Sequence, residues 1–161
     1  MKHPFPPLYD ENSKILILGS FPSVKSREQL FFYGHPQNRF WKVLASVFNQ
    51  PIPETIDEKK SFLSMNNIAL WDVIASCDIV GSSDSTIRNV VANDLSEILK
   101  NSDIKRIFTN GKTSQIYYDK YIKKQLQRDA FCLPSTSPAN ASYSLERLVE
   151  SWGEIIIEKN Q

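Results

Sequence analysis

The sequence predicts an α/β fold in which a four-stranded, mainly parallel sheet lies between helices in a three-layer sandwich. Short apolar segments that favour strands alternate with segments of helical periodicity, as in the βαβ units that build parallel sheets. Polar turns follow the apolar segments, and the carboxyl ends of parallel strands form the edge where ligands bind. A chain of 161 residues suits one domain with its own core. We therefore expect a single domain over residues 1–161, with a Pro-rich N-terminal arm over about residues 1–13.

In the first half of the chain, the apolar segment 14–19 predicts a buried strand that closes at a glycine. Residues 38–48 have helical spacing, and Asn38 is a candidate N-cap. Thr55 and Glu58 form a capping box for a helix that extends to about Met65.

In the second half, residues 68–74 predict the next strand, and the polar stretch 76–84 has no periodicity. The remaining elements follow in order. They are a helix capped by Asn93 through about Lys100, a strand over 104–109, a helix carrying Ile116, Tyr117, Tyr121 and Ile122, a short strand over 130–133, and a last helix from near Ser144.

Composition excludes several classes of protein. Formal net charge is +1, which neither indicates nor excludes a nucleic-acid partner. No apolar run is long enough to cross a bilayer, and the N-terminus has no apolar signal region, so a cytoplasmic protein is expected. Cys77 and Cys132 are far apart and predict two buried, reduced thiols. With His3 and His35 the only histidines, we expect no zinc site and no iron–sulfur cluster.

The expected strands all end in polar turns, and a further Gly/Pro-rich loop precedes the helix at Asn38. Because the carboxyl ends of parallel strands share one edge, these turns are expected to converge on one site. Hydroxyl, amide and aromatic groups dominate there, which favours a flat polar ligand over a metal ion. The turns are 19–23, 71–72, 110–111 and 133–140, and the additional loop is 34–38.

Segments carrying these turns resemble, in order, the sequence motifs of the uracil-DNA glycosylase superfamily, and those of its hypoxanthine-DNA (deoxyinosine) glycosylase branch in particular. Together they extend over most of the chain, from about residue 14 to residue 157. The segments are 17–23 (ILGSFPS), 32–41 (FYGHPQNRFW), 70–73 (LWDV), 110–112 (NGK) and 133–140 (LPSTSPAN).

The resemblance implies a monofunctional enzyme that hydrolyses the N-glycosidic bond of a flipped, deaminated base in DNA, with hypoxanthine as the expected base. Many members position water with an Asp or Asn in the first motif, but here that turn offers Ser20 and Phe21. In the hypoxanthine branch the catalytic Asn belongs to the His-Pro-x-Asn string, which implies Asn38. Its amide oxygen would orient the attacking water. No metal or organic cofactor is expected.

The remaining site residues follow from the same resemblance and from the chemistry of a flat base. The expected base pocket comprises Gly19, Ser20, Phe21, Pro22, Phe40, Trp71, Asp72 and Asn110. The expected DNA contacts are Ser23, His35, Ser135, Ser137, Pro138, Ala139 and Asn140.

Five of these residues also have a structural interpretation. Asn38 serves as a helix cap, Trp71 as a buried strand residue, and Asp72 and Asn110 as turn formers, while His35 packs its loop. Two other functions stay open. One is a glycosylase specialised for uracil, although the third motif lacks the histidine that some uracil-specific members carry. The other is a non-catalytic nucleic-acid binding module. The chain is expected to act as a monomer.

Overall fold

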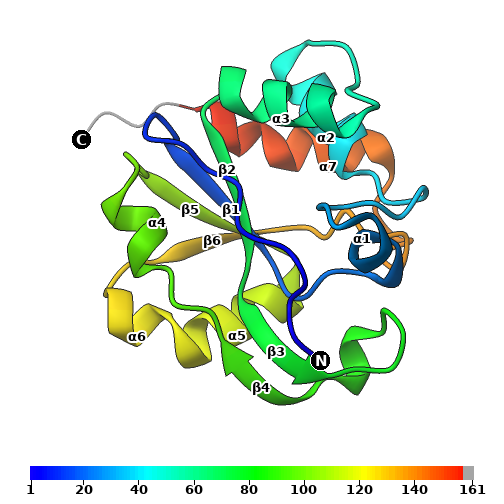
Figure 1. Ribbon diagram of the computed structural model, residues 1–161. Coiled ribbons are helices and arrows are strands. Elements are labelled where there is room, and N and C mark those ends of the chain that lie inside the picture. Colours follow the sequence, from blue (N-terminus) through cyan, green and yellow to red (C-terminus); the bar gives the residue numbers. More distant parts are fainter. Residues whose placement is uncertain (158–161) are drawn as a thin grey trace.

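The computed structural model of the protein describes residues 1–157 and has a parallel sheet at its centre (Figure 1). The sheet contains four strands in the order β2-β1-β5-β6, and every neighbouring pair is parallel. This confirms the predicted α/β fold with a central four-stranded parallel sheet. The strands are β1 (Ile15–Gly19), β2 (Ile68–Asp72), β5 (Arg106–Asn110) and β6 (Ala130–Leu133).

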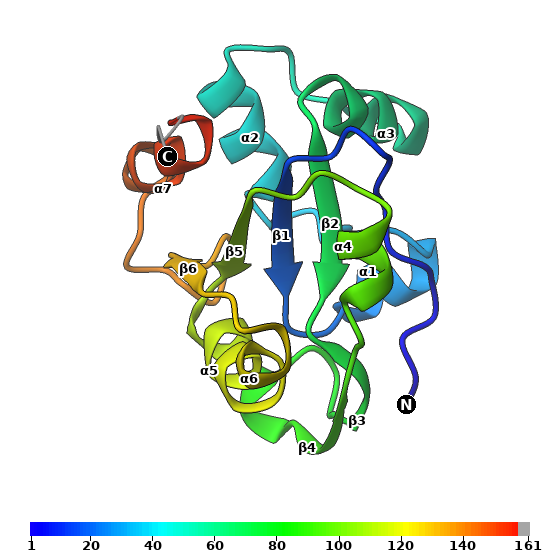
Figure 2. The ribbon, with the colours of Figure 1, turned by 90° about the vertical axis from the view of Figure 1, so that its left-hand side faces the viewer.

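Helices cover both faces of this sheet. In Figure 1, α2, α3 and α7 lie on one side, and α4, α5 and α6 lie on the other. Figure 2 shows β1 and β2 side by side with their arrows pointing the same way. The helices are α1 (Val24–Gln29), α2 (Phe40–Phe48), α3 (Ile56–Met65), α4 (Ser96–Lys100), α5 (Lys112–Tyr121), α6 (Lys123–Leu126) and α7 (Leu145–Trp152), with 3₁₀ turns at Asp84–Thr86 and Gly153–Ile156.

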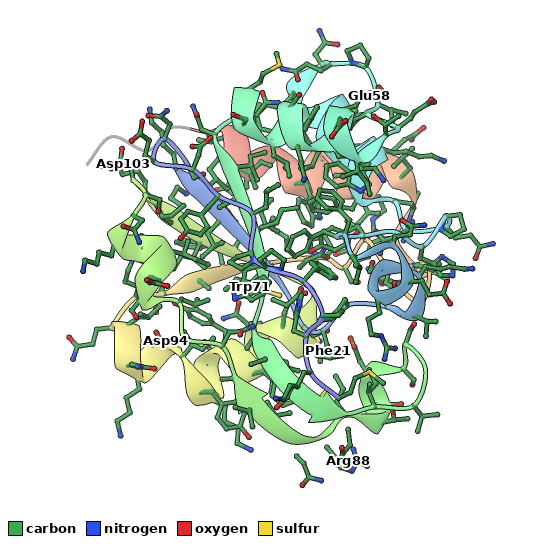
Figure 3. The ribbon with its side chains drawn as sticks, viewed as in Figure 1. Phe21, Glu58, Trp71, Arg88, Asp94 and Asp103 are labelled. Carbon is green, nitrogen blue, oxygen red and sulfur yellow. The ribbon has the colours of Figure 1, made fainter. Side chains whose placement is uncertain are left out.

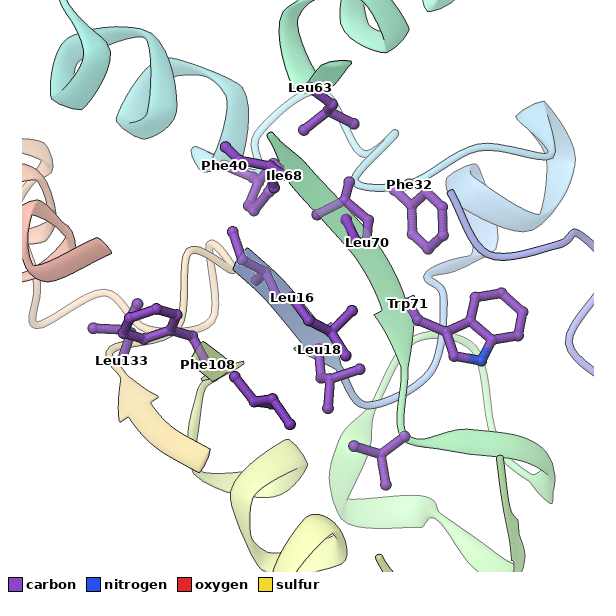
Figure 4. Packing of buried hydrophobic residues seen from close by; sticks show 14 of the residues in the cluster. Leu16, Leu18, Phe32, Phe40, Leu63, Ile68, Leu70, Trp71, Phe108 and Leu133 are labelled. Atoms are coloured by element: carbon purple, nitrogen blue, oxygen red, sulfur yellow. The ribbon is translucent and has the colours of Figure 1, made fainter. Parts of the chain in front are cut away.

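The core lies where β1 and β2 run between the two helix layers (Figure 4). All residues of β2 are buried although it is an edge strand, because the N-terminal arm covers its outer edge at Leu70 and helices cover the sheet. Phe40 of α2 is fully buried and packs edge to face on Trp152 of α7, with ring centroids 5.8 Å apart. This contact ties α2 to α7 and thereby fixes the loop that precedes Phe40.

The predicted helix starts agree with the structure in two places. Thr55 and Glu58 form the expected capping box of α3. The Ser144 side chain accepts a hydrogen bond from the backbone N–H of Arg147 at the start of α7. Each such cap contributes about 1 kcal/mol, because it satisfies an N–H group that has no partner within the helix.

Two other starts differ from the prediction. Helix α2 begins at Phe40 rather than at Asn38, although Asn38 Oδ1 still accepts from the backbone N–H of Phe40. Helix α4 begins at Ser96, and Asn93 is not its cap, because the Asn93 amide instead donates to the backbone oxygen of Asp72. A long-range contact has replaced the local one.

The polar stretch 76–84 forms the end of one strand and the connecting loop of an antiparallel hairpin, β3 (Ile74–Asp78) and β4 (Arg88–Ala92). The expected strand 68–74 therefore ends at Asp72, and Ile74 begins β3. Register shifts interrupt the pairing, so the side chains do not alternate in a way that the sequence reveals. Cys77 and Ile87 are buried under the hairpin, whereas Val80 at its loop is exposed. The hairpin extends beyond the carboxyl end of β2 and borders the site.

The N-terminal arm packs along the body, as expected. Lys2 and Leu8 form isolated antiparallel bridges with Ser76 and Leu70, and the N-terminal amine donates to the backbone oxygen of Cys77. The arm thereby carries His3 into the interior, which the sequence analysis did not foresee.

Two expectations about side-chain exposure were wrong or incomplete. Cys77 is buried as predicted, but Cys132 on the edge strand β6 is exposed, so the pair are not both core thiols. Helix α5 turns Ser114 and Tyr118 inward while Ile116 is exposed. None of the helices within residues 1–157 has the length and apolar character needed to span a membrane.

Candidate active site

A cavity of 310 Å³ opens at the carboxyl ends of β1, β2 and β5, between these strands, α1 and the β3–β4 hairpin. This is near the lower end of the range for ligand pockets, roughly 300–1,000 Å³, and suits a single nucleobase with part of its sugar. The cavity is lined by Gly19, Ser20, Phe21, Pro22, Ser23, Ser26, Phe32, Tyr33, His35, Asn38, Asp72, Ser82, Asp84, Asn110, Ser135, Thr136, Ser137, Pro138 and Ala139.

The floor of the cavity forms around Gly19, the last residue of β1. A Cβ atom at this position would lie 2.5 Å from Asp72 Oδ1 and 3.2 Å from the Tyr33 hydroxyl. Only glycine leaves room for both groups, because the first contact is shorter than any stable carbon–oxygen approach. A carboxylate oxygen and a phenolic hydroxyl therefore both face the end of β1.

Asp72 is held from behind by the N-terminal arm. Its Oδ2 atom lies 2.7 Å from His3 Nε2, and both side chains are almost completely buried. The His3 ring in turn contacts Trp71, with centroids 4.4 Å apart. Because Oδ2 is engaged by His3, Oδ1 is the carboxylate oxygen that faces Gly19.

Tyr33 lies on the opposite side of the floor. Its backbone is left-handed, with φ 54°, and its ring stacks on Phe40 at a centroid distance of 3.8 Å. The hydroxyl is buried and has no hydrogen bond of standard geometry within residues 1–157, although the Asn110 side chain lies near enough to favour its ionised form. Burial raises the pKa of Tyr33 well above its usual value, the Asp72 charge adds to this, and Asn110 opposes it. The hydroxyl is therefore a proton-bearing donor at neutral pH.

Asn38, Thr136 and Asn110 form a chain of hydrogen bonds along one wall. The Thr136 hydroxyl donates to Asn38 Oδ1 (2.8 Å) and accepts from Asn110 Nδ2 (3.0 Å). The Thr136 backbone N–H donates to Asn110 Oδ1 (3.0 Å). Asn38 Oδ1 also accepts from the backbone N–H of Phe40 (3.0 Å).

This network changes the expected role of the Asn38 amide. A carbonyl oxygen has two lone pairs, and two donors already occupy those of Asn38 Oδ1. The oxygen therefore does not serve as the acceptor that orients water, contrary to the expectation from sequence. The Nδ2 group remains as the donor that Asn38 can offer within the cavity.

Arg39 secures the loop that carries Thr136. Its guanidinium donates to the backbone oxygens of Ser137 (3.2 Å), Asn140 (3.1 Å) and Tyr143, and its backbone N–H donates to Thr136 O (3.1 Å). One side chain thus binds several carbonyls of the segment between β6 and α7. The geometry of the cavity wall depends on this attachment.

The β3–β4 hairpin brings Asp84 to the rim. The Ser20 hydroxyl donates to Asp84 Oδ1 (3.2 Å). Loss of solvent around the carboxyl raises the pKa of Asp84, hydrogen bonds from Ser20 and Thr113 oppose this, and the Asp72 charge adds to it. Figure 3 shows Phe21 in the region where α1 and this hairpin approach each other.

Most of the expected site residues converge on the cavity. Phe40 and Trp71 do not, because both are buried behind it. Phe40 supports Tyr33, and Trp71 packs against His3 and Phe32 (Figure 4). Asn140 lies outside the lining and donates to the backbone oxygen of Ser135. The expected residues in the lining are Asn38, Gly19, Ser20, Phe21, Pro22, Asp72, Asn110, Ser23, His35, Ser135, Ser137, Pro138 and Ala139.

Sequence reasoning missed Tyr33, Thr136, Asp84 and His3. Tyr33 and Thr136 stand inside segments already singled out, so their polar groups were an available signal. Asp84 and His3 gave none, because each reaches the cavity region through a contact between distant parts of the chain.

The fold and the cavity together define an α/β protein with a cavity large enough for a small planar ligand at the carboxyl edge of a parallel sheet. The chain belongs to the uracil DNA glycosylase superfamily, whose sequence profile matches residues 6–155.

Relatives of known name support the same assignment. A hypoxanthine DNA glycosylase of Methanosarcina barkeri (strain Fusaro / DSM 804) is 35% identical over 156 residues, which is 95% of this chain and 96% of that protein. A hypoxanthine DNA glycosylase of Methanosarcina acetivorans is 34% identical over 149 residues, covering 91% and 93% of the two chains. The solution NMR structure of a Methanosarcina acetivorans protein described as a candidate uracil DNA glycosylase superposes with a TM-score of 0.81 at 33% identity, covering 96% of this chain and 95% of that one.

Proposed function

We propose that this protein is a monofunctional DNA glycosylase that removes hypoxanthine from deoxyinosine in DNA by hydrolysis of the N-glycosidic bond. The names of the relatives support the activity and the base. The donor and acceptor on the cavity floor support a base with a carbonyl beside a ring N–H. This floor chemistry is the observation on which the proposal mainly rests. The cavity lining also contains no lysine to form a Schiff base with the sugar, which favours hydrolysis without strand cleavage.

The floor has one donor and one acceptor near Gly19, the Tyr33 hydroxyl and Asp72 Oδ1. A deaminated base has a carbonyl oxygen next to a ring N–H, which is the complementary pattern. Guanine and thymine share this pattern, so the pair distinguishes deaminated bases from adenine and cytosine only. Adenine and cytosine have an amino group next to a bare ring nitrogen, so each would place donor against donor and acceptor against acceptor. Leaving such buried groups unpaired discriminates strongly between substrates.

The same pattern fits uracil, which also has a carbonyl beside a ring N–H. Uracil removal is therefore the second candidate activity. The similarity to the Methanosarcina acetivorans structure, which is described as a candidate uracil DNA glycosylase, also supports this second activity. The floor pair by itself does not rank the two bases.

Base removal requires the nucleotide to leave the DNA stack, at a cost of a few kcal/mol that is lower for a weakly paired, damaged base. We propose that residues 135–140 and the turn at Ser23 contact the DNA backbone beside the flipped nucleotide. Their hydroxyl and backbone N–H groups suit phosphate oxygens. Asn38 would donate through Nδ2 to the attacking water. We further propose that the protein acts as a monomer in the cytoplasm, where Cys77 and Cys132 would stay reduced.

The test uses oligonucleotides that contain one deoxyinosine, one deoxyuridine or only normal bases, followed by alkali to cleave abasic sites. We expect cleavage at deoxyinosine, less or none at deoxyuridine, and none in the control. Strand cleavage before alkali would contradict a monofunctional enzyme. Tight binding to deoxyinosine DNA without release of base would instead indicate a non-catalytic binding module, and faster release of uracil would make uracil the principal substrate.

A further inference from the structure

The hydrolysis proposed above requires a group that accepts a proton from water, and the side chain of Asn38 does not supply one. Both lone pairs of its amide oxygen are occupied, by the backbone N–H of Phe40 and by the hydroxyl of Thr136. Its Nδ2 group only donates. Another residue in the cavity must therefore take the proton.

Two carboxylates and one histidine line the cavity, and they differ in how far they are already engaged. Asp72 is almost completely buried, and His3 occupies one of its oxygens. His35 Nδ1 accepts from the backbone N–H of Gln37 at 3.1 Å, within its own loop. Asp84 is exposed at the rim and is held by hydroxyl donors, so it keeps lone pairs available for water.

The position of Asp84 is determined by its own hairpin and by the turn that follows β1. The Ser20 hydroxyl holds Oδ1 at 3.2 Å, and Ser82, two residues earlier, accepts from the backbone N–H of Val24 at 2.9 Å. The Arg27 side chain also donates to the backbone oxygen of Gly81. The loop is therefore anchored to α1 on one side and to the cavity floor on the other.

We propose that Asp84 is a catalytic base, which accepts the proton of the water that attacks the anomeric carbon. In this step the water oxygen forms a bond to C1′, and its proton passes to the Asp84 carboxylate. The bond from C1′ to the base breaks, and its electron pair leaves with the base. The carboxylic acid then returns the proton to the departing base or to solvent, which restores the enzyme. This role rests on the proposed glycosylase activity.

The electrostatic surroundings suit this role. Although Asp84 as a residue is exposed, the protein around its carboxyl removes part of the solvent and raises its pKa; the Asp72 charge from β2 acts in the same direction, while hydrogen bonds from Ser20 and Thr113 oppose them. A carboxylate with a raised pKa holds a proton more strongly, and so it is a better base at neutral pH. Arg27 on α1, and Tyr33 and His35 in the loop that follows it, are further charged or titratable side chains around the cavity.

The experiment compares Asp84→Asn with Asp78→Asn in the full chain, by single-turnover release of hypoxanthine. Asp78 belongs to the same hairpin, but it hydrogen-bonds Asn89 and does not line the cavity. We expect Asp84→Asn to lower the rate by about 100-fold, with little change in binding to deoxyinosine DNA, and Asp78→Asn to leave the rate unchanged. Asp84→Glu, which keeps the carboxylate, should recover part of the rate.

The pH profile separates catalysis from a merely structural role. The wild-type rate should fall at acidic pH as the base becomes protonated, and this acidic limb should be absent in Asp84→Asn. A normal rate in a folded Asp84→Asn variant would overturn the proposal, as would an unchanged acidic limb. Wild-type protein that releases no base would contradict the glycosylase activity instead, so the two failures are distinguishable.

Discussion

At the scale of single residues, the Tyr33 hydroxyl is an exception to the rule that buried polar groups are paired. Its stacking on Phe40 and its left-handed backbone hold the ring in place. An unpaired hydroxyl is expected to reduce stability, and we propose that a base bound in the cavity completes its hydrogen bond.

Tyr33→Phe tests this explanation directly. We expect the free energy of unfolding to stay the same or rise, because no protein hydrogen bond is lost. The rate of hypoxanthine release should fall by roughly 10-fold or more, the effect of one lost donor to the base carbonyl. Chemical denaturation and single-turnover kinetics measure the two quantities. A stable variant with full activity on deoxyinosine would show that the hydroxyl does not contact the base.

We expect Asn38 to combine a structural and a catalytic contribution, which two variants can separate. Asn38→Ala removes the acceptor of the Phe40 N–H and the Thr136 hydroxyl, so we expect a stability loss of about 1–2 kcal/mol together with a large loss of turnover.

Asn38→Asp keeps both acceptor contacts but lacks the Nδ2 donor. It should retain most of the stability while turnover stays low, as judged by thermal unfolding and single-turnover rates. If Asn38→Asp is as active as wild type, the Nδ2 group has no role in positioning water.

At the scale of elements, the segment between β6 and α7 depends on α2 for its conformation. Arg39 binds several of its carbonyls with one planar guanidinium, which a lysine ammonium does not reproduce. The segment therefore follows α2, and α2 is fixed by Phe40 in the core.

Arg39→Lys is expected to raise KM for deoxyinosine DNA more than it lowers kcat, because the segment that would contact DNA becomes less ordered. The free energy of unfolding should fall by about 1.5–3 kcal/mol, the range for hydrogen bonds to a charged group. Steady-state kinetics and denaturation measure these effects. A fall in kcat alone, with KM unchanged, would indicate that the segment acts in the chemical step instead.

At the scale of the whole molecule, buried tyrosines make stability sensitive to alkaline pH. The Tyr118 hydroxyl donates to the backbone oxygen of Arg128 at 2.8 Å, and burial raises the pKa of Tyr118 to about 12. The unfolded chain loses this proton near pH 10 whereas the folded chain retains it, so stability falls as pH rises between these values. The raised pKa of Tyr33 acts in the same direction.

Urea denaturation at about pH 9 and about pH 11 measures this effect. Wild type should lose stability over the interval, and Tyr118→Phe should lose less, because it removes one of the titrating groups. Equal losses in the two proteins would show that Tyr118 does not contribute to the alkaline transition.

The sequence by itself was sufficient to predict three features. They are the alternation of strands and helices, the capping box at Thr55 and the convergence of polar turns on one edge of the sheet. These features arise from local periodicity and from the geometry of parallel strands, which a sequence records directly. The resemblance of ordered motifs led to the superfamily and to Asn38. It did not exclude Phe40 and Trp71 from the cavity, because a motif does not say which side of a buried helix or strand faces the ligand.

Only the tertiary structure decided which hydrogen-bond partner each polar group of the site has. The hairpin that carries Asp84 has an interrupted register, and the arm that carries His3 has no pattern of its own, so their positions follow from contacts between residues more than 60 apart in the chain. The occupied oxygen of Asn38 and the unpaired hydroxyl of Tyr33 are also consequences of packing. Hydrogen-bonding capacity can be counted from a sequence, but which partner uses it depends on how distant segments come together.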